Sequence, residues 1–443
     1  MTDSFYSHRR YVGAHIIVPT AEPLIEGNPQ GNTMNLLADA GPMADDLIRL
    51  RRHLHEEPEV GLALPRTQEK ILTALDPLPL TLTQGQALSS VTAVLRGARP
   101  GPTVLLRADM DALPMTEQTG LPFASRVPGH MHACGHDLHT AMLVGAAHLL
   151  TRQRDRIAGN VVLMFQPGEE GGHDGARLML EEGVLDAAGD RPVAAYALHV
   201  SSRHYPHGRF ATRPGPLMAA CARLDVTVHG SGGHGSAPHH ARNPIPAACA
   251  MVGELHAYLA RGVDPLQPVA LSVGTINAGT AANVIPPTAH FQATVRTFDP
   301  GVNEHLTHAL PRLCEAVAIA HGVRAEARYL VEYPATVAAP EESRFAADVT
   351  RELFGAHRYQ DMPGPLTASE DFSRVLDQIP GTIVQLGSAP AGQDPEREPG
   401  NHSPHVVFDD RLIADGAALY AGLALARLQK QPAHADAAGA ALR

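Results

Sequence analysis

The chain has 443 residues, about three times the commonest domain size, so we expect two domains rather than one. Hydrophobic residues make up 44% and charged residues 18%, which is usual for a globular protein and excludes wholesale disorder. The 35 basic and 46 acidic residues give a net charge of −11, and no long basic run is present, which argues against nucleic acid as a partner. Histidine is unusually frequent, with 26 residues, and this excess needs an explanation.

The cysteines and the N-terminal residues bear on the cellular compartment. The chain has four cysteines, Cys134, Cys221, Cys249 and Cys314. They are too widely spaced for the dense disulfide framework of a small secreted domain, so we expect reduced thiols in the cytoplasm. Residues 1–24 have no apolar stretch with a cleavage site, and the longest helix-like apolar run, near 141–150, falls short of the roughly 20 residues that span a membrane. We therefore expect neither a secretory signal nor a membrane anchor.

The first half of the chain alternates between helix and strand signals. Residues 1–40 have a mixed pattern and are predicted to form an N-terminal extension. Leu47, Leu50 and Leu54 then recur at helical spacing. Further along the chain we predict strands at 104–107, 160–166 and 193–200 and a helix at 140–154. This alternation favours an α/β domain on a mostly parallel, buried sheet.

The pattern changes near residue 216. Strands of alternating polarity and two amphipathic helices predict a compact α+β module at 217–331. After it the chain returns to α/β character, with a helix at 342–355, a strand at 382–387 and a final helix at 410–429. We therefore predict one discontinuous α/β domain, 41–216 and 332–443, with the module inserted into it.

Four segments place metal-ligand side chains just after predicted strands, where ligands collect on an open α/β sheet. In the first, Asp109 and Asp111 are two residues apart, so an extended backbone points both the same way. The alternative is a solvated acidic turn. In the second, ten residues hold His130, His132, Cys134, His136, Asp137 and His139. Thiolate and imidazole suit zinc, and the alternative is a histidine-rich loop with one buried cysteine.

The third and fourth segments add carboxylates and one further histidine. Glu169 and Glu170 are adjacent in a glycine-rich loop, so one could bind metal while the other transfers protons. Paired glutamates are otherwise ordinary surface charge. His199 ends an apolar strand, and taken alone it reads more simply as a packed core histidine.

The order of these motifs resembles a known family. The motifs are RADMDALP, HACGHDLHTA, FQPGEEGG, ALHV, GSGGHGSAPH, ANVIPP, VRTFDP, SEDFS and NHSPH, within residues 44–430. They look like the metal-dependent amidohydrolases that include hippurate hydrolase and the indole-acetyl-amino-acid hydrolases, with aminoacylases and carboxypeptidase G as more distant relatives. The resemblance implies a zinc-exopeptidase-like α/β domain with a mostly parallel mixed sheet and an inserted ferredoxin-like lid or dimerisation domain.

The resemblance also implies a two-metal centre. Its ligands would be Cys134, His136, Glu170, His199 and His402, with Glu169 as general acid/base and Asp111 orienting the site. Two divalent ions about 4 Å apart can polarise an amide carbonyl and lower the pKa of a bridging water toward about 7. Mixed sulfur, nitrogen and oxygen ligands suit Zn, Mn, Co or Ni, and the choice among them stays open, as does the division of ligands between the ions.

The inserted module has its own candidates. By the same resemblance, His234 would act across the interface of a homodimer on the oxyanion, while Asn283 and Arg296 would bind the substrate. Arginine suits a free carboxylate because its planar fork donates two parallel hydrogen bonds. The alternatives are a histidine in a turn and an arginine on an exposed strand face. Ligands and His234 on different domains also imply hinge closure.

The reaction expected from this resemblance is hydrolysis of N-acyl amino acids. A dipeptidase or carboxypeptidase with the same chemistry is the alternative, and a metal-binding or ligand-binding protein without catalysis is a further one. The sequence departs from the family pattern at Gly168, where the family has alanine, at Leu62–Leu64, where relatives often place an acidic pair, and at Asn243 in place of an acidic residue. These departures leave the preferred acyl group and amino acid open.

Overall fold

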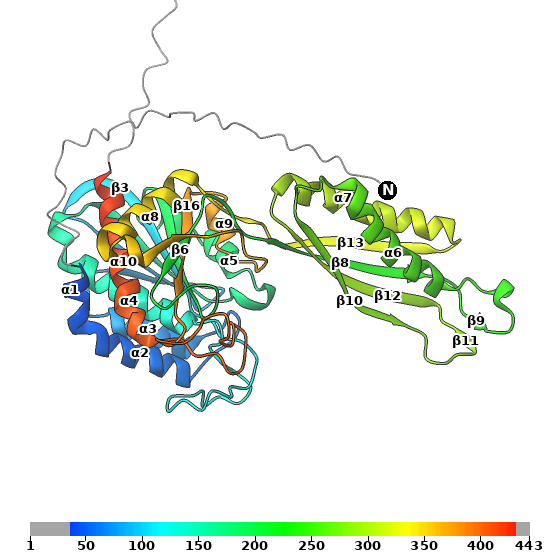
Figure 1. Cartoon of the computed structure of the whole chain (residues 1–443), viewed down its shortest axis with the longest axis horizontal. Helices are drawn as coiled ribbons and strands as arrows, with labels where there is room; N and C mark the ends of the chain where they lie inside the picture. The colour runs from blue at the N-terminus through cyan, green and yellow to red at the C-terminus, as the bar shows by residue number, and fades with distance from the viewer. Residues whose placement is uncertain (1–35, 431–443) are drawn as a thin grey trace, which may run out of the picture.

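The described part of the chain begins with a short helix of the large domain. The structure, a computed structural model, describes residues 36–430 (Figure 1). Most of the extension predicted at 1–40 thus lies outside the described residues, as do 431–443 at the other end of the predicted catalytic domain. Residues within helix α1 (Leu36–Ala40) belong to the large domain, because Leu36 and Ala40 are buried in its core.

The large domain is built on one eight-stranded sheet. In spatial order its strands are β1 (Thr81–Gln84), β2 (Val91–Arg96), β4 (Ala158–Gln166), β3 (Arg99–Asp109), β5 (Pro192–Ser201), β16 (Gly381–Gly387), β6 (Phe210–Thr212) and β15 (Tyr359–Asp361). The pairs β4·β3, β3·β5, β5·β16 and β6·β15 are parallel, and the other three are antiparallel. This mostly parallel mixed sheet confirms the expected α/β fold.

Helices cover both faces of this sheet. In β3 the side chains of Val104 and Leu106 join one buried cluster, and that of Leu105 joins another on the opposite face, as strand geometry requires. The helices over the first cluster, besides α1, are α2 (Ala44–Glu56), α3 (Pro65–Leu75), α4 (His136–Arg152), α8 (Pro340–Phe354) and α10 (Ile413–Gln429). Those over the second are α5 (Gly175–Glu181) and α9 (Ser373–Leu376). Figure 1 shows the sheet between these two layers.

Two short strands connect the large domain to the inserted one. β7 (Gly215–Met218) pairs with β14 (Thr336–Ala338), and Leu217 and Ala338 are buried in the large domain's second cluster. The chain therefore leaves the large domain after β7 and returns at β14. The strands of the inserted sheet run from Ala220 to Tyr333, against the predicted range of 217–331.

The inserted domain, called the lid below, is a four-stranded antiparallel sheet with two helices. Its elements in chain order are β8 (Ala220–His229), α6 (Pro244–Gly262), β10 (Val269–Ala278), β12 (Thr288–Thr297), α7 (Pro300–Ala320) and β13 (Arg324–Tyr333). The spatial order β10-β12-β8-β13 is that of a ferredoxin-like βαββαβ unit. Both helices pack on one face of the sheet, where Met251 and Leu306 meet Phe291.

A further pair of short strands lies at the end of the lid farthest from the large domain. It consists of β9 (Gly233–His234) and β11 (Val284–Ile285), as Figure 1 shows. Within residues 36–430, no helix has both the length and the apolar character needed to cross a membrane.

Candidate metal centre

The candidate ligands lie where parallel strands end. β3 ends at Asp109, β4 ends just before the Glu169 loop, and β5 carries His199 near its carboxyl end. Cys134 comes directly before helix α4, which begins at His136 and therefore earlier than the predicted 140. Because the loops after parallel strands meet at one edge of the sheet, segments far apart in the sequence come together here.

A glycine lets the Cys134 loop approach β5. Gly135 has a φ of 86°, in the left-handed region that favours glycine. A Cβ atom at this position would also overlap the side chain of Val200 on β5. Glycine thus meets two requirements at once, and Cys134 and His136 are held close to His199.

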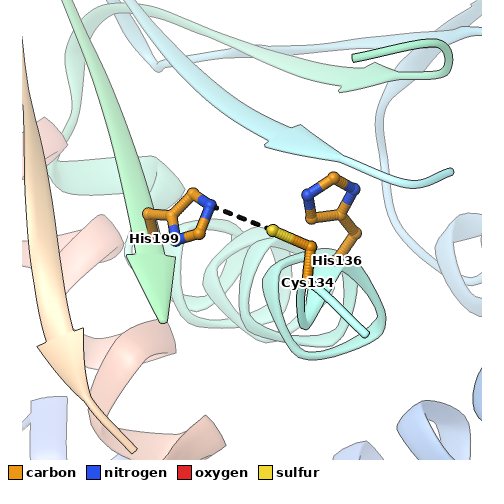
Figure 2. Close-up of side chains that lie close together, drawn as sticks. All are labelled: Cys134, His136 and His199. Atoms are coloured by element: carbon orange, nitrogen blue, oxygen red, sulfur yellow. Dashed lines mark hydrogen bonds between the residues drawn. The ribbon is translucent and has the colours of Figure 1, made fainter. Parts of the chain in front are cut away.

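Cys134, His136 and His199 form a first group of donor atoms (Figure 2). Sγ of Cys134 lies 3.5 Å from Nε2 of His199. We assign Nδ1 of each histidine as the hydrogen-bond donor: His199 to the carbonyl of Val200 at 2.8 Å, and His136 to the carbonyl of Asp111 at 2.9 Å. In this tautomer Nε2 of each ring carries a free lone pair, as a metal ligand needs.

Cys134 also belongs to a second group, with Glu170 and His402. Nε2 of His402 lies 3.0 Å from Oε1 of Glu170, which is 4.0 Å from Nε2 of His136 and so joins the two groups. His402 has a φ of 69°, and its N–H donates to the carbonyl of Ala133 at 2.8 Å. Strained backbone of this kind gathers at functional sites.

These five side chains fit divalent metal ions. Nε2 of His136 is buried and has no hydrogen-bond partner among the described residues, and Oε1 of Glu170 is buried 3.0 Å from Nε2 of His402. Buried polar atoms are costly when left unpaired, so their position suits atoms that coordinate an ion. One thiolate, three imidazoles and one carboxylate form a donor set typical of zinc and other first-row transition metals.

The charges around Cys134 favour its thiolate. Burial acts to raise the pKa of Cys134, but His199 and His136 hold it well below its usual range. In return, and against burial, Cys134 raises the pKa of His199 to about 9. Burial first, and then Cys134, raise the pKa of Glu170 to about 7. A divalent cation fits such a cluster because it takes the place of the shared protons.

Asp111 fixes the loop that carries the two glutamates. Its carboxylate accepts hydrogen bonds from the backbone N–H groups of Glu169 and Glu170, each at 3.0 Å. Glu169 has a carboxylate oxygen within 4.8 Å of donor atoms on His136 and Glu170, and it is buried. Burial, and then the charges of Glu370 and Glu170, hold the pKa of Glu169 well above its usual range. A carboxyl group of this kind beside ligands suits proton transfer.

Comparison with known proteins identifies the family. A match to Peptidase family M20/M25/M40 covers residues 105–426. The chain belongs to this family. A thermostable carboxypeptidase of Saccharolobus solfataricus is 38% identical over 87% of this chain and 96% of its own length. The hippurate hydrolase of Campylobacter jejuni is 33% identical over 89% of this chain and 100% of its own length. The crystal structure of a dinuclear metal-binding M20 peptidase from Bacillus subtilis is 31% identical, covers 87% of this chain and 99% of that chain, and has a TM-score of 0.74. The resemblance to metal-dependent amidohydrolases is thereby confirmed.

A buried charge network behind the site of this M20 protein was not predicted from the sequence. Arg107 donates to Gln166 at 2.8 Å, Asp109 at 2.6 Å, Glu370 at 2.8 Å and Asp371 at 3.0 Å, and all five side chains are buried. Arg107 and the two acidic residues lie inside the motifs RADMDALP and SEDFS, where charges interrupt or border apolar runs. Charges placed against apolar runs in this way were the sequence feature that could have indicated the buried network.

The carboxylate of Asp109 accepts hydrogen bonds from two residues. Besides its bond to Arg107, it accepts a hydrogen bond from Nδ1 of His139 at 2.5 Å. Nε2 of His139 accepts from the backbone N–H of Val200 at 2.8 Å. Asp109 and His139 therefore tie the end of β3 to helix α4 and β5, directly behind His199, whose ring centroid is 4.8 Å from that of His139.

A cavity of about 680 Å³ opens beside the ligand groups. Glu169 and the candidate ligands Cys134, Glu170, His199 and His402 line it from the large domain, and Arg296 and Tyr333 line it from the lid. Arg296 is half-buried, and its Nη1 donates to the hydroxyl of Ser369. The other guanidinium donors remain available to a ligand in the cavity.

His234 and Asn283 lie elsewhere in this chain. His234 is on β9, Asn283 directly precedes β11, and both side chains are exposed. Figure 1 shows β9 and β11 at the far end of the lid. Neither residue lines the cavity that the described chain forms around the ligand groups. The conformation of this single chain therefore brings Arg296, but not His234 or Asn283, to the site.

Two of the departures from the family pattern contact each other. Gly168 has a φ of 72°, and a Cβ atom there would overlap Cδ2 of Leu62. With an alanine at 168, the end of the Leu62 side chain would have to move away from its present position.

Proposed function

We propose that this M20 protein is a metal-dependent amidohydrolase that cleaves the amide bond of N-acyl amino acids. The observation that carries the proposal is the pair Glu169 and Glu170, whose backbone N–H groups share the carboxylate of Asp111. Adjacent glutamates held in this way can act separately, one as a ligand and the other as a proton carrier. Similarity to a hippurate hydrolase supports the substrate class.

We propose that two divalent ions are held by Cys134, His136, Glu170, His199 and His402. Support comes from the two groups of donor atoms that share Cys134 and are joined through Glu170. Ions bound there would polarise the amide carbonyl and make a bound water more acidic. Zinc, manganese, cobalt and nickel all suit the donor set.

Glu169 moves the proton in this mechanism. Its carboxylate takes a proton from the attacking water as the C–O bond forms, and it then delivers that proton to the leaving nitrogen as the C–N bond breaks. The products are a carboxylic acid and a free amino acid. The buried surroundings of Glu169 favour its protonated form between the two steps.

Arg296 is proposed to bind the carboxylate of the amino acid. It lines the cavity from the lid, and its bond to Ser369 orients the guanidinium while leaving other donors free. A bidentate guanidinium–carboxylate pair would fix the amide with its acyl side toward the ligand groups. This role gives the lid a part in substrate binding.

We further propose a homodimer in which His234 and Asn283 serve the site of the partner chain. Both are exposed at the far end of the lid, outside the cavity of their own chain. A histidine side chain there could donate a hydrogen bond to the developing oxyanion of the neighbouring site. The free thiols of all four cysteines, including the proposed ligand Cys134, suit a reducing compartment, and we propose the cytoplasm.

A carboxypeptidase is the second candidate, because a thermostable carboxypeptidase is 38% identical to this chain. The two activities use the same chemistry on different substrates. Glycine and glutamate conjugates of aromatic acids, compared with simple dipeptides, would separate them by their kcat/KM values.

The test of the mechanism is a hydrolysis screen of purified protein loaded with Zn²⁺, Mn²⁺ or Co²⁺. Glu169→Gln should lower kcat by about 10²- to 10⁴-fold while the metal content is retained. Glu69→Gln, at an exposed glutamate, is the matched control and should behave as the parent protein. Normal turnover by Glu169→Gln would overturn the mechanism, and a parent protein that binds metal but hydrolyses no conjugate would favour a non-catalytic role.

A further inference from the structure

The last residue of the lid's final strand reaches the loop that carries the proposed general base. Tyr333 ends β13 and is buried. Its hydroxyl donates to the backbone carbonyl of Glu169 at 2.6 Å. One side chain from the lid therefore contacts the base loop, residues 169–174, through its hydrogen bond to Glu169.

The base loop has a backbone that needs support. Gly171 and Gly172 have φ values of 69° and 77°, and Asp174, which is not a glycine, has a φ of 55°. Left-handed backbone at a residue with a Cβ persists only where surrounding contacts hold it. The hydrogen bond from Tyr333 to the carbonyl of Glu169 is such a contact, at the start of the loop.

A second connection runs in parallel with the first. Nε and Nη2 of Arg374 donate to the carboxylate of Asp174 at 3.1 and 3.0 Å. Nη2 of the same guanidinium donates to the backbone carbonyl of Glu332 at 2.9 Å. Glu332 lies in a β-bulge between Val331 and Tyr333. The end of β13 is thus bound to the base loop both directly, through Tyr333, and through Arg374.

We propose that Tyr333 is a positioning residue that couples the lid to Glu169. The inference rests on the proposed function, because it assumes that Glu169 transfers the proton. The Tyr333 hydroxyl holds the backbone of Glu169 while the same strand is part of the lid that carries Arg296. A change in the lid's angle on binding substrate is therefore transmitted to the base through a hydrogen bond rather than through packing alone. Tyr333 itself exchanges no proton with the substrate.

The test compares Tyr333→Phe with Tyr329→Phe. Both tyrosines are on β13, and the hydroxyl of Tyr329 donates to Asn303 within the lid at 2.9 Å, away from the base loop. Tyr333→Phe should lower kcat at least tenfold on an N-acyl amino acid, with KM and metal content within twofold of the parent values. The decrease in the kcat of Tyr333→Phe should be smaller on the matching thioester, whose thiolate leaving group needs no protonation. Tyr329→Phe should leave all of these unchanged.

Amide hydrogen exchange supplies a readout that is independent of turnover. In Tyr333→Phe, exchange within 169–174 should be faster than in the parent protein, and in Tyr329→Phe it should be the same. Arg374→Gln removes the second connection. Like Tyr333→Phe, it should lower kcat and speed up exchange within 169–174. The coupling is overturned if Tyr333→Phe keeps its kcat, loses metal together with activity, or leaves the exchange of 169–174 unaltered. If the parent protein hydrolyses no conjugate, the proposed function fails, while the exchange comparison still decides whether Tyr333 holds the loop.

Discussion

The two domains differ in how complete their functional groups are within one chain. In the large domain the thiolate, imidazoles and carboxylates converge at the ends of parallel strands, with donor atoms within 4.8 Å of one another in each group. At the far end of the lid, His234 and Asn283 face solvent and meet no ligand group of their own chain. Strand ends and the loops that follow them assemble the first set within one chain, whereas the described chain does not bring the second set to a site.

The sharpest test of this contrast is removal of a proposed ligand from the large domain. His136→Ala should lose metal and more than about 100-fold of kcat/KM, since even residues behind a metal ligand cost about 10- to 100-fold. Metal analysis after gel filtration and steady-state kinetics measure the two effects. His53→Ala, at an exposed histidine on α2, is the control. Retention of full metal and activity by His136→Ala would contradict the proposed centre.

The lid should behave differently when its histidine is removed. His234→Ala should keep its metal but lower kcat by about 10²- to 10³-fold, as expected for loss of one oxyanion donor. Mixing it with inactive Glu169→Gln under conditions that exchange subunits should restore part of the activity, because one site of a mixed dimer then has an intact Glu169 and an intact partner histidine. Failure of the mixture to recover, with exchange verified by mass, would place His234 in its own chain's site or in none.

Arg296 belongs to the lid but lines the cavity beside the ligand groups, so its replacement should weaken substrate binding. Arg296→Lys should raise KM by about 10- to 100-fold for substrates with a free carboxylate, because a bidentate pair becomes a single contact. The corresponding amides, which lack that carboxylate, should show little change in KM. Arg328→Lys, on the exposed side of β13, is the matched control. An equal loss on both kinds of substrate would argue for a structural role.

The parts of the site that could be predicted from the sequence are those marked by the order and spacing of motifs. Cys134, His136, Glu170, His199 and His402 could be selected because each stands in a motif of fixed order, and parallel strands then bring them together. Arg107 and Glu370 also stand in such motifs, but their pairing could not be predicted, because 263 residues separate them and only the fold buries both together. Tyr333 escaped notice for a related reason: its function lies in a hydroxyl bond to a backbone carbonyl, which leaves no pattern of residue types.

The smallest expected effect concerns Gly168 and Leu62, where this chain departs from its family within the large domain. Gly168→Ala should destabilise the protein by about 1–2 kcal/mol through the left-handed backbone. A further loss of about 1–3 kcal/mol should come from overpacking against Leu62. In a Leu62→Ala background the overpacking disappears and the backbone cost stays, so the two substitutions should be non-additive in a denaturant-unfolding cycle of metal-loaded protein. Simple additivity would mean that a methyl group at 168 does not press against Leu62. Because Gly168 directly precedes Glu169, a kcat that falls in Gly168→Ala and recovers in the double variant would show that this contact also sets the position of the base.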